Sequence, residues 1–377
     1  MGELLEAAVN GGRSVFFVVP DAIDDDQRVS GGNVYDQRVR DGLRADGWEV
    51  RMVLVTDRGE GWTARALAQL PEGALVLVDG LLATREPEAL IAHRARLCLV
   101  VLVHMVTGEL GGDQAAALRA ARLIIATSGW TRSELLEQDA ADPHRIVVAH
   151  PGAGPAPVTA ASASGGRLLC VAAVAPHKGQ DLLVRALIGF ADRDDWTCTI
   201  VGSLHVDPDF VEALTTQVDA VGLSDRIRFA GVLSGRDLEA AYAGADLMVL
   251  PSRTESYGMA VAEALAHGVP VLATAVGGLP EAIAVPEAAV LVPPDDVWAL
   301  HVVLQQWWAD PERRRARRAA ALEARATGRS WRTTTSIVAA ALEAAGAQAG
   351  GPGFGRPEPG CFQAGGTQTG RTEAVPS

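Results

Sequence analysis

Residues 247–283 read LMVLPSRTESYGMAVAEALAHGVPVLATAVGGLPEAI, and they give the strongest structural signal in the chain. Four apolar residues at the start, 247–250, predict a buried strand, which a polar turn and a short helix follow. The helix is expected to end at His267-Gly268, since glycine commonly stands just past a helix C-terminus. A second buried strand over 269–274 and a Gly-Gly turn complete the unit. This order of strand, helix and strand is typical of parallel α/β sheets.

Two carboxylates flank a predicted anion site in this stretch. Glu255 is on the turn and Glu263 lies two helical turns further along, with seven residues between them. The helix opens at Ser256-Tyr257-Gly258, where small residues let free backbone N–H groups face an anion. A nucleotide-diphosphate sugar needs such N–H groups for phosphate, and one carboxylate each for sugar and ribose hydroxyls. The alternative is that both glutamates are solvated surface residues. The place of Glu255 at a strand end, where α/β proteins bind ligands, favours the site.

The stretch resembles the Glu-x₇-Glu signature of the retaining glycosyltransferases of family 4. These are group 1 glycosyltransferases, among them glycogen synthase-like and mannosyltransferase-like enzymes. The matching residues are Pro251-Ser252, Glu255, Gly258, Glu263-Ala264, Gly268, Pro270-Val271 and Gly277-Gly278. The resemblance extends over residues 14–342 and implies the GT-B fold, in which two Rossmann-like domains with doubly wound parallel sheets face each other across a cleft. It also implies no metal and no permanently bound cofactor, with a nucleotide-diphosphate sugar as co-substrate.

Length, composition and charge limit the class of protein to which the chain can belong. A chain of 377 residues is long enough for two domains, and 48% hydrophobic with 5% aromatic residues suits parallel α/β sheets. A net charge of −13 and a pI near 5.1 argue against nucleic acid as a partner. No run approaches the ~20 apolar residues of a membrane span, and residues 1–13 lack the features of a signal peptide. We therefore expect a soluble cytoplasmic protein without stable membrane insertion. The cysteines lack metal-ligand spacing and are expected to be buried free thiols: Cys98, Cys170, Cys198 and Cys361.

A glycine pair near the N-terminus is a second candidate site. Residues 14–19 predict a buried strand, and Gly31-Gly32 open a helix after a polar loop. A strand, a glycine-rich turn and a helix can bind phosphate or sugar, although most glycine pairs only make a turn. The resemblance implies that this turn faces the donor phosphate and the acceptor. Three aspartates in the preceding loop, residues 24–26, could suggest a metal site, but we interpret them as solvated charge and assign no metal.

His104 follows a strongly apolar segment, residues 97–103, and is expected at the carboxyl end of a central strand. A histidine in such a place is commonly structural. The resemblance implies that His104 contacts the donor sugar, with binding of a sugar hydroxyl favoured over proton transfer. Glu109, five residues on, is either an acceptor contact or, as we favour, a surface residue.

Lys178 is the most informative cation in the second half of the chain. It stands between a predicted strand, residues 168–174, and a predicted helix, so its ammonium can meet a phosphate near a helix N-terminus. The resemblance implies that Lys178 binds the diphosphate and serves in catalysis. The family commonly has an arginine five residues earlier, where this chain has Ala173. Arg253, or a residue from the first domain, is the candidate replacement.

The other donor-binding residues follow from the resemblance. Backbone groups near Gly231, Val232 and Leu233 are expected to hold the nucleotide base. The helix start from Ser256 through Met259 is expected to hold the diphosphate through its N–H groups.

The predicted domain organisation has four parts. An N-terminal Rossmann-like domain on the acceptor side covers residues 1–157, and a donor-side Rossmann-like domain covers 158–310. Helices over 311–346 are expected to cross back onto the first domain, and a Gly/Pro/Thr/Gln-rich tail over 347–377 is expected to be disordered.

The resemblance implies transfer of a sugar, with retention at the anomeric carbon, from a UDP- or GDP-sugar to a hydroxyl or amine of a small molecule or glycan. Glu255, His104 and Lys178 are the predicted catalytic residues. A sugar-nucleotide 2-epimerase of the same fold and a non-catalytic nucleotide-sugar-binding protein remain as alternatives. A dinucleotide-dependent oxidoreductase is disfavoured, because no Gly-x-Gly-x-x-Gly follows the first predicted strand.

Overall fold

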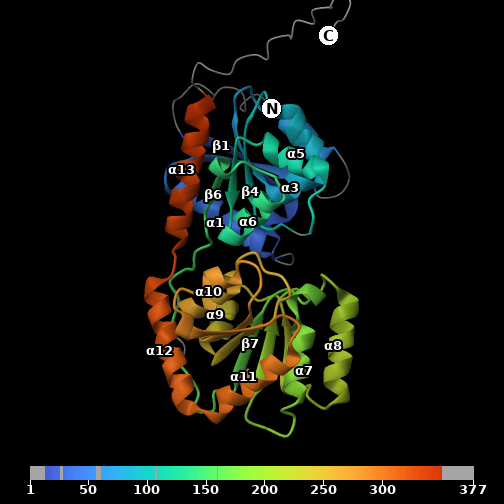
Figure 1. Ribbon diagram of the computed structural model, residues 1–377, viewed down its shortest axis with the longest axis vertical. Helices are drawn as coiled ribbons and strands as arrows, with labels where there is room; N and C mark the ends of the chain where they lie inside the picture. Colours follow the sequence, from blue (N-terminus) through green and yellow to red (C-terminus); the bar gives the residue numbers. More distant parts are fainter. Residues whose placement is uncertain (1–12, 26–28, 57–60, 107, 159, 350–377) are drawn as a thin grey trace, which may run out of the picture.

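The computed structural model describes residues 13–25, 29–56, 61–106, 108–158 and 160–349. Two α/β domains are stacked along the long axis of the molecule, and each contains one six-stranded parallel sheet (Figure 1). The predicted fold class, two doubly wound parallel sheets, is therefore confirmed. Asp26, Cys361 and most of the tail predicted to be disordered lie outside the described residues.

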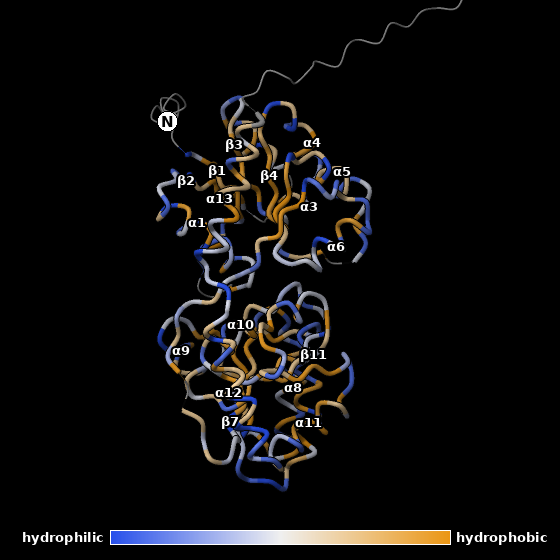
Figure 2. The backbone as a smooth tube through the Cα atoms, turned by 60° about the vertical axis from the view of Figure 1, so that its left-hand side comes forward, coloured by the Kyte–Doolittle hydropathy of each residue, from blue (hydrophilic) through white to orange (hydrophobic). Residues whose placement is uncertain are grey.

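The first domain has the strand order β2-β1-β3-β4-β5-β6. Its strands are β1 (Ser14–Pro20), β2 (Glu49–Val55), β3 (Leu75–Asp79), β4 (Cys98–Val103), β5 (Leu123–Ala126) and β6 (Ile146–Val148). Its helices are α1 (Gly31–Ala45), α2 (Trp62–Ala68), α3 (Gly80–Arg85), α4 (Pro87–His93), α5 (Gly112–Ala120) and α6 (Gly129–Glu137). Strand β4, CLVVLV, is buried at every position, because helices cover both faces of a parallel sheet. In Figure 2 the backbone around β4 accordingly has the hydrophobic colour.

The second domain has the strand order β12-β11-β10-β7-β8-β9. Its strands are β7 (Arg167–Val171), β8 (Thr197–Val201), β9 (Ile227–Gly231), β10 (Leu247–Leu250), β11 (Val271–Thr274) and β12 (Ala289–Val292). Its helices are α7 (Gln180–Ile188), α8 (Pro208–Ala220), α9 (Gly235–Ala243), α10 (Met259–Ala266), α11 (Val297–Ala309) and α12 (Pro311–Thr327). The quoted stretch thus forms β10, α10 and β11 at the middle of the domain.

Each sheet reverses its strand order at one point. The reversal lies between β1 and β3 in the first sheet and between β10 and β7 in the second. In open α/β sheets, ligands bind beyond the carboxyl ends of the strands at such a switch point. The loops after β7 and β10, with Lys178 and Glu255, are therefore neighbours at the ligand-binding edge.

Two chain segments connect the domains and run side by side. Ala153 N donates to Arg329 O at 2.9 Å, and Ala153 forms a parallel bridge with Ser330. After Ser330, helix α13 (Trp331–Ala349) packs on the first domain against α1, and its apolar residues Val338 and Leu342 are fully buried in that core. Figure 1 shows α12 beside the second domain and α13 beside the first.

Two features of composition can be compared with the structure. Cys98, Cys170 and Cys198 are buried and free, as expected. Among the helices of the described part, none is both long enough and apolar enough to cross a membrane.

Candidate functional site

Lys178 and Glu255 form an ion pair at the switch point of the second sheet. Lys178 is on the 3-10 turn Pro176–Lys178 after β7, and its Nζ lies 2.7 Å from Glu255 Oε1. Ser252 Oγ donates to the same carboxylate oxygen at 3.0 Å. The two charged side chains keep 20% and 12% of their surface exposed, so a ligand can reach them. Lys178 is also the sole lysine among the 377 residues.

The two loops that hold this pair touch through their backbones. Arg253 N donates to His177 O at 2.8 Å. Gly179 has a φ of +69°, and a Cβ there would lie 2.0 Å from Pro251 O. Only glycine fits such an approach in this conformation. The distance between the Lys178 and Glu255 backbones is therefore fixed by the fold before any ligand binds.

Helix α10 begins without a side-chain cap. Its N-cap residue, Gly258, has a φ of +89°, and no side chain of the described residues caps it. The first N–H groups of a helix have no partner within the helix and bear partial positive charge. The start of α10, from Gly258 and Met259, is therefore suited to bind an anion. Tyr257, just before it, is buried, and this burial raises its pKa.

Glu263 lies inside α10, and its environment differs from that of Glu255. Tyr242 OH donates to Glu263 Oε2 at 2.8 Å. Burial raises the pKa of Glu263, against the opposing effects of the Tyr242 hydrogen bond and the charge of Arg38 on α1. Arg38 belongs to the first domain, so the field of that domain acts on a residue of the second.

Arg253, the predicted replacement for the phosphate-binding arginine, is paired with two carboxylates. Its guanidinium pairs with Asp181 at 2.8 Å and with Asp295 at 2.6 Å, and it also donates to Pro176 O. Its charge is thus matched by two carboxylates. These contacts hold Arg253 against the 3-10 turn Pro176–Lys178, and its role toward the donor phosphate stays a prediction.

His104, at the end of β4, lies between two carboxylates of the first domain. Its Nε2 is 2.9 Å from Asp36 Oδ1 on α1 and 3.3 Å from Asp79 Oδ2 at the end of β3. Burial disfavours the charged imidazole, but the two carboxylates outweigh it and raise the pKa of His104 to about 10. Burial also raises the pKa of Asp36, to about 7, whereas hydrogen bonds outweigh burial and lower that of Asp79.

The same three side chains form the single group in the described part of the chain that could hold a metal ion. Their ligand atoms lie within 4.8 Å of one another. A protonated imidazole between the two carboxylates would supply positive charge to this group, and we assign no metal to it. Asp24, from the aspartate loop, instead pairs with Arg40 at 2.8 Å.

The two halves of the predicted site meet at glycines 31 and 32. A Cβ on Gly32 would lie 3.3 Å from His104 Cδ2, and a Cβ on Gly31 would lie 3.8 Å from Met259 Sδ. Met259 also packs against the apolar core of the first domain. The start of α1 therefore lies between His104 of the first domain and the start of α10 of the second.

Gly231 ends β9 at the edge of the second sheet, beyond β8, and Val232 and Leu233 follow it. Gly231 has a φ of +70°, and its carbonyl accepts from Gly202 N at 2.9 Å. This segment is at the carboxyl edge of the sheet, as is Lys178, but at a strand further from the switch point. Glu109, for which an acceptor contact or a surface position was expected, is exposed.

Sequence reasoning did not assign roles to Asp36, Asp79 or Tyr242. A signal existed for Asp79, because it ends a predicted strand in the same way as His104. Asp36 and Tyr242 are single polar residues on helices, and nothing in the sequence pairs them with residues tens of positions away.

Comparisons with known proteins show which family model and which relatives the chain resembles. Residues 161–324 match the family model "Glycosyl transferases group 1". The chain is 33% identical over 258 residues to the D-inositol 3-phosphate glycosyltransferase of Kineococcus radiotolerans, covering 60% of this chain and 58% of that protein. It is 34% identical over 253 residues to the protein of the same name from Mycobacterium bovis, covering 62% and 51%. The chain thus spans little more than half the length of these curated relatives.

Solved structures are similar over most of the chain. Sucrose-phosphate synthase from Thermosynechococcus elongatus has a TM-score of 0.71 at 20% identity and covers 89% of this chain and 100% of its own. Anabaena Alr3699/HepE in complex with UDP-glucose has a TM-score of 0.70 at 19% identity and covers 88% and 99%. At these identities the likeness shows the fold alone. The chain therefore has the GT-B fold, and its residues 161–324 match the group 1 glycosyl transferases.

Proposed function

We propose that this chain is a retaining, metal-independent glycosyltransferase. It moves a sugar from a nucleotide-diphosphate sugar to a hydroxyl or amine of a small molecule or glycan. The main support is the 2.7 Å pair of Lys178 and Glu255 at the switch point, beside the uncapped start of α10. An ammonium, a carboxylate and free amides in one place can bind a diphosphate and sugar hydroxyls together.

The diphosphate binds between Lys178 and the amides of residues 257–259. As the bond from the anomeric carbon to the phosphate oxygen breaks, negative charge grows on the leaving group. Lys178 and the N-terminal end of the α10 dipole stabilise that charge, which is the main demand of the reaction. These groups supply the positive charge that a metal ion would otherwise provide.

The two glutamates have separate roles. Glu255 accepts hydrogen bonds from the donor sugar and stabilises positive charge at the anomeric carbon. Its hydrogen bond from Ser252 holds the carboxylate in place while Lys178 turns toward phosphate. Glu263 accepts from the ribose hydroxyls, and Tyr242 fixes its second oxygen.

The first domain supplies the acceptor side. His104 is held protonated by Asp36 and Asp79, which both face its Nε2. Its other ring N–H, on Nδ1, therefore donates to a hydroxyl of the donor sugar, and the ring does not act as a base. The small residues at Gly31-Gly32 leave room for the acceptor and for the donor phosphate next to Met259.

The anomeric configuration is retained because the acceptor attacks the face of the sugar from which the leaving group departs. The acceptor oxygen forms a bond to the anomeric carbon while the bond to diphosphate breaks on the same face. The acceptor proton passes to the departing phosphate oxygen. This route needs no covalent intermediate with the protein, because the acceptor supplies the proton and the departing diphosphate takes it up.

A two-stage experiment tests the proposal. Thermal-shift measurements against UDP-, GDP- and ADP-sugars identify the donor, with UDP-glucose first because a structural neighbour was solved with it. Transfer is then measured with two kinds of acceptor. Inositol phosphates are chosen because the relatives are named D-inositol 3-phosphate glycosyltransferases, and simple glycans are the second kind. We expect release of nucleoside diphosphate that persists in a metal chelator and a product with the donor's anomeric configuration. An epimer formed from donor alone, or binding without turnover, would refute the proposal.

A further inference from the structure

Glu281 of the second domain reaches across to the first domain. It belongs to the 3-10 turn Leu279–Ala282, just after Gly278. Its Oε2 accepts from Gly129 N at 2.7 Å and its Oε1 accepts from Trp130 N at 2.7 Å. His150 Nε2 lies 2.8 Å from Glu281 Oε2. One carboxylate of the second domain therefore has three partners in the first.

The helix end that Glu281 contacts makes this carboxylate a strong anchor. Gly129 and Trp130 are the first two residues of α6, whose N-cap Ser128 already accepts from Thr131 N. Glu281 thus satisfies two amides that the cap leaves open, at the positive end of the helix dipole. Burial disfavours its charge, but the hydrogen bonds from Gly129, His150 and Trp130 outweigh burial and lower the pKa of Glu281.

The turn before Glu281 supports the loop of Glu255. Gly278 N donates to Glu255 O at 2.9 Å. A Cβ on Gly277 would lie 1.9 Å from Glu255 O, and a Cβ on Gly278 would lie 2.0 Å from Ser256 O and 2.9 Å from Ser128 Oγ. The Gly277-Gly278 turn therefore fills the space between the Glu255 loop and the first domain.

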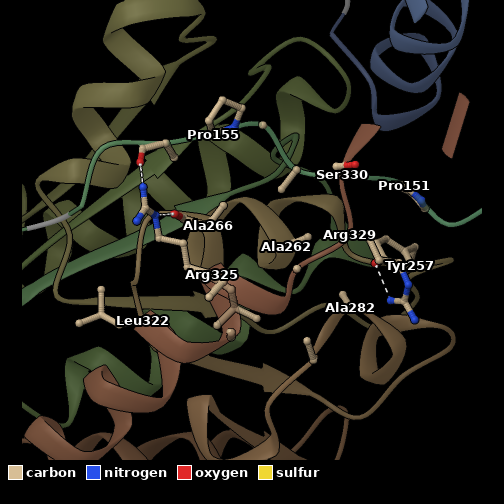
Figure 3. A pocket seen from close by; sticks show the side chains of 18 residues that line it. Pro151, Pro155, Tyr257, Ala262, Ala266, Ala282, Leu322, Arg325, Arg329 and Ser330 are labelled. Atoms are coloured by element: carbon tan, nitrogen blue, oxygen red, sulfur yellow. Dashed lines mark hydrogen bonds between the residues drawn. The ribbon is translucent and has the colours of Figure 1, made fainter. Parts of the chain in front are cut away.

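The crossover segment is tied to the same contact. Arg329 Nη1 donates to Glu281 O at 2.9 Å and to Tyr257 OH at 3.3 Å, the second of which is drawn in Figure 3. Thr334 Oγ1, on α13, donates to His150 O at 2.7 Å. Both sides of the Glu281 contact are thus bonded to the segment that joins the domains.

We propose that Glu281 is a positioning residue, which fixes the two domains relative to each other and holds the Glu255 loop through the Gly277-Gly278 turn. Its carboxylate already accepts from two amides of α6 and contacts His150, so we assign it no contact with the substrate. The kinetic part of this inference rests on the proposed function, whereas the structural part stands on the contacts alone.

Spin-label distances between the domains test the structural part. Labels at Asp113→Cys on α5 and Glu212→Cys on α8, both exposed, are placed in a Cys361→Ser background. We expect Glu281→Ala to lengthen and broaden the distance distribution. Glu281→Gln keeps one acceptor oxygen for one of the two amides and should have an intermediate effect. Glu287→Ala removes an exposed glutamate nearby and should leave the distribution unchanged.

Steady-state kinetics of the unlabelled variants test the positioning role. We expect kcat of Glu281→Ala to fall about tenfold or more, equal to about 1.4 kcal/mol in the barrier. The KM for the donor should change less than kcat does, because Lys178, Glu263 and the start of α10 still bind the diphosphate and ribose although the Glu255 loop loses support. Glu281→Gln should recover part of kcat, and Glu287→Ala should match the parent.

The outcomes separate the two proposals. An unchanged distance distribution in Glu281→Ala overturns the inference, and so does a changed distribution with parental kcat. If Glu281→Ala does not fold, the isosteric Glu281→Gln gives the same comparison. A parent protein that transfers no sugar refutes the proposed function, and the distance measurement still tests the contact.

Discussion

Replacing Lys178 by alanine tests the centre of the proposed site. The substitution removes the ammonium 2.7 Å from Glu255 Oε1 and leaves that carboxylate with the hydrogen bond from Ser252. Because Lys178 is the sole lysine, no neighbouring lysine can take its place. Arg253 is the other cation that the sequence suggested for the diphosphate, and its guanidinium is paired with Asp181 and Asp295.

The expected magnitude follows from the geometry. A charge-assisted hydrogen bond to phosphate contributes about 1.5–3 kcal/mol, so the Kd for the donor should rise about 10- to 150-fold. The folded protein loses one partly buried ion pair, which costs about 1–2 kcal/mol because a second hydrogen bond to Glu255 remains. In a domain of this size the unfolding midpoint should fall by roughly 2–8 °C.

Two measurements check this prediction. Isothermal titration calorimetry with the nucleoside diphosphate that gives the largest thermal shift compares Lys178→Ala, Lys178→Arg and the parent. Reductive methylation with ¹³C-formaldehyde keeps the charge of Lys178 and labels one lysine and the N-terminus. Its single lysine NMR signal should shift when the nucleotide is added.

The reasoning would be refuted if the Kd of Lys178→Ala equalled that of the parent, or if the lysine NMR signal did not shift at saturating nucleotide. Lys178→Arg serves as the matched control, since it keeps the charge and changes the geometry. We expect its affinity to lie between those of the alanine variant and the parent.

Three other predictions concern neighbouring residues. Glu255→Gln should lower kcat at least about 100-fold, because the carboxylate charge at the donor sugar is lost. The unfolding midpoint should fall no further than in Lys178→Ala, because Ser252 and Lys178 can still donate to the amide oxygen; near-parental turnover measured by nucleoside diphosphate release would contradict this role. The His104 ring should stay protonated from pH 6 to 8, and its NMR titration should have a midpoint near 10 that Asp36→Asn lowers. Because the pKa of His104 is raised above 6.5, the protonated ring stabilises the folded state fully below about pH 6.5, and this stabilisation is lost as the pH rises through 10. A titration midpoint near 6.5 would disprove the contact with the two carboxylates. Gly277→Ala should abolish transfer and lower the unfolding midpoint, since its Cβ would meet Glu255 O at 1.9 Å. The control Gly73→Ala, with a φ of +72° and open space around the Cβ, should cost only the ~1–2 kcal/mol of backbone strain. Equal melting curves for the two variants would argue against the close contact at Gly277.

Elements with a strong local pattern could be predicted from the sequence. Apolar runs such as 247–250 become strands, and the helix of Glu263 ends at His267-Gly268, because these signals depend on neighbouring residues only. Helix α3 and strand β12 were not predicted. The six residues of α3 are too few to show a helical period, and this helix depends on a cap from Asp79, whose Oδ1 accepts from Leu81 N at 2.6 Å. The sequence of β12, AVLV, begins with an alanine directly after Ala288 and lies among turn residues that hide the strand.

The sequence by itself determined that Lys178 and Glu255 follow buried strands, and parallel topology brings such strand ends to one edge of a sheet. Tertiary structure alone decided which charges pair. Asp36, Asp79 and His104 come from three elements of the first domain, and Glu281 meets α6 more than 140 positions earlier in the chain. Local patterns report which face of an element is buried, but a polar contact between distant elements depends on how the packed layers align. That alignment is set by the whole core.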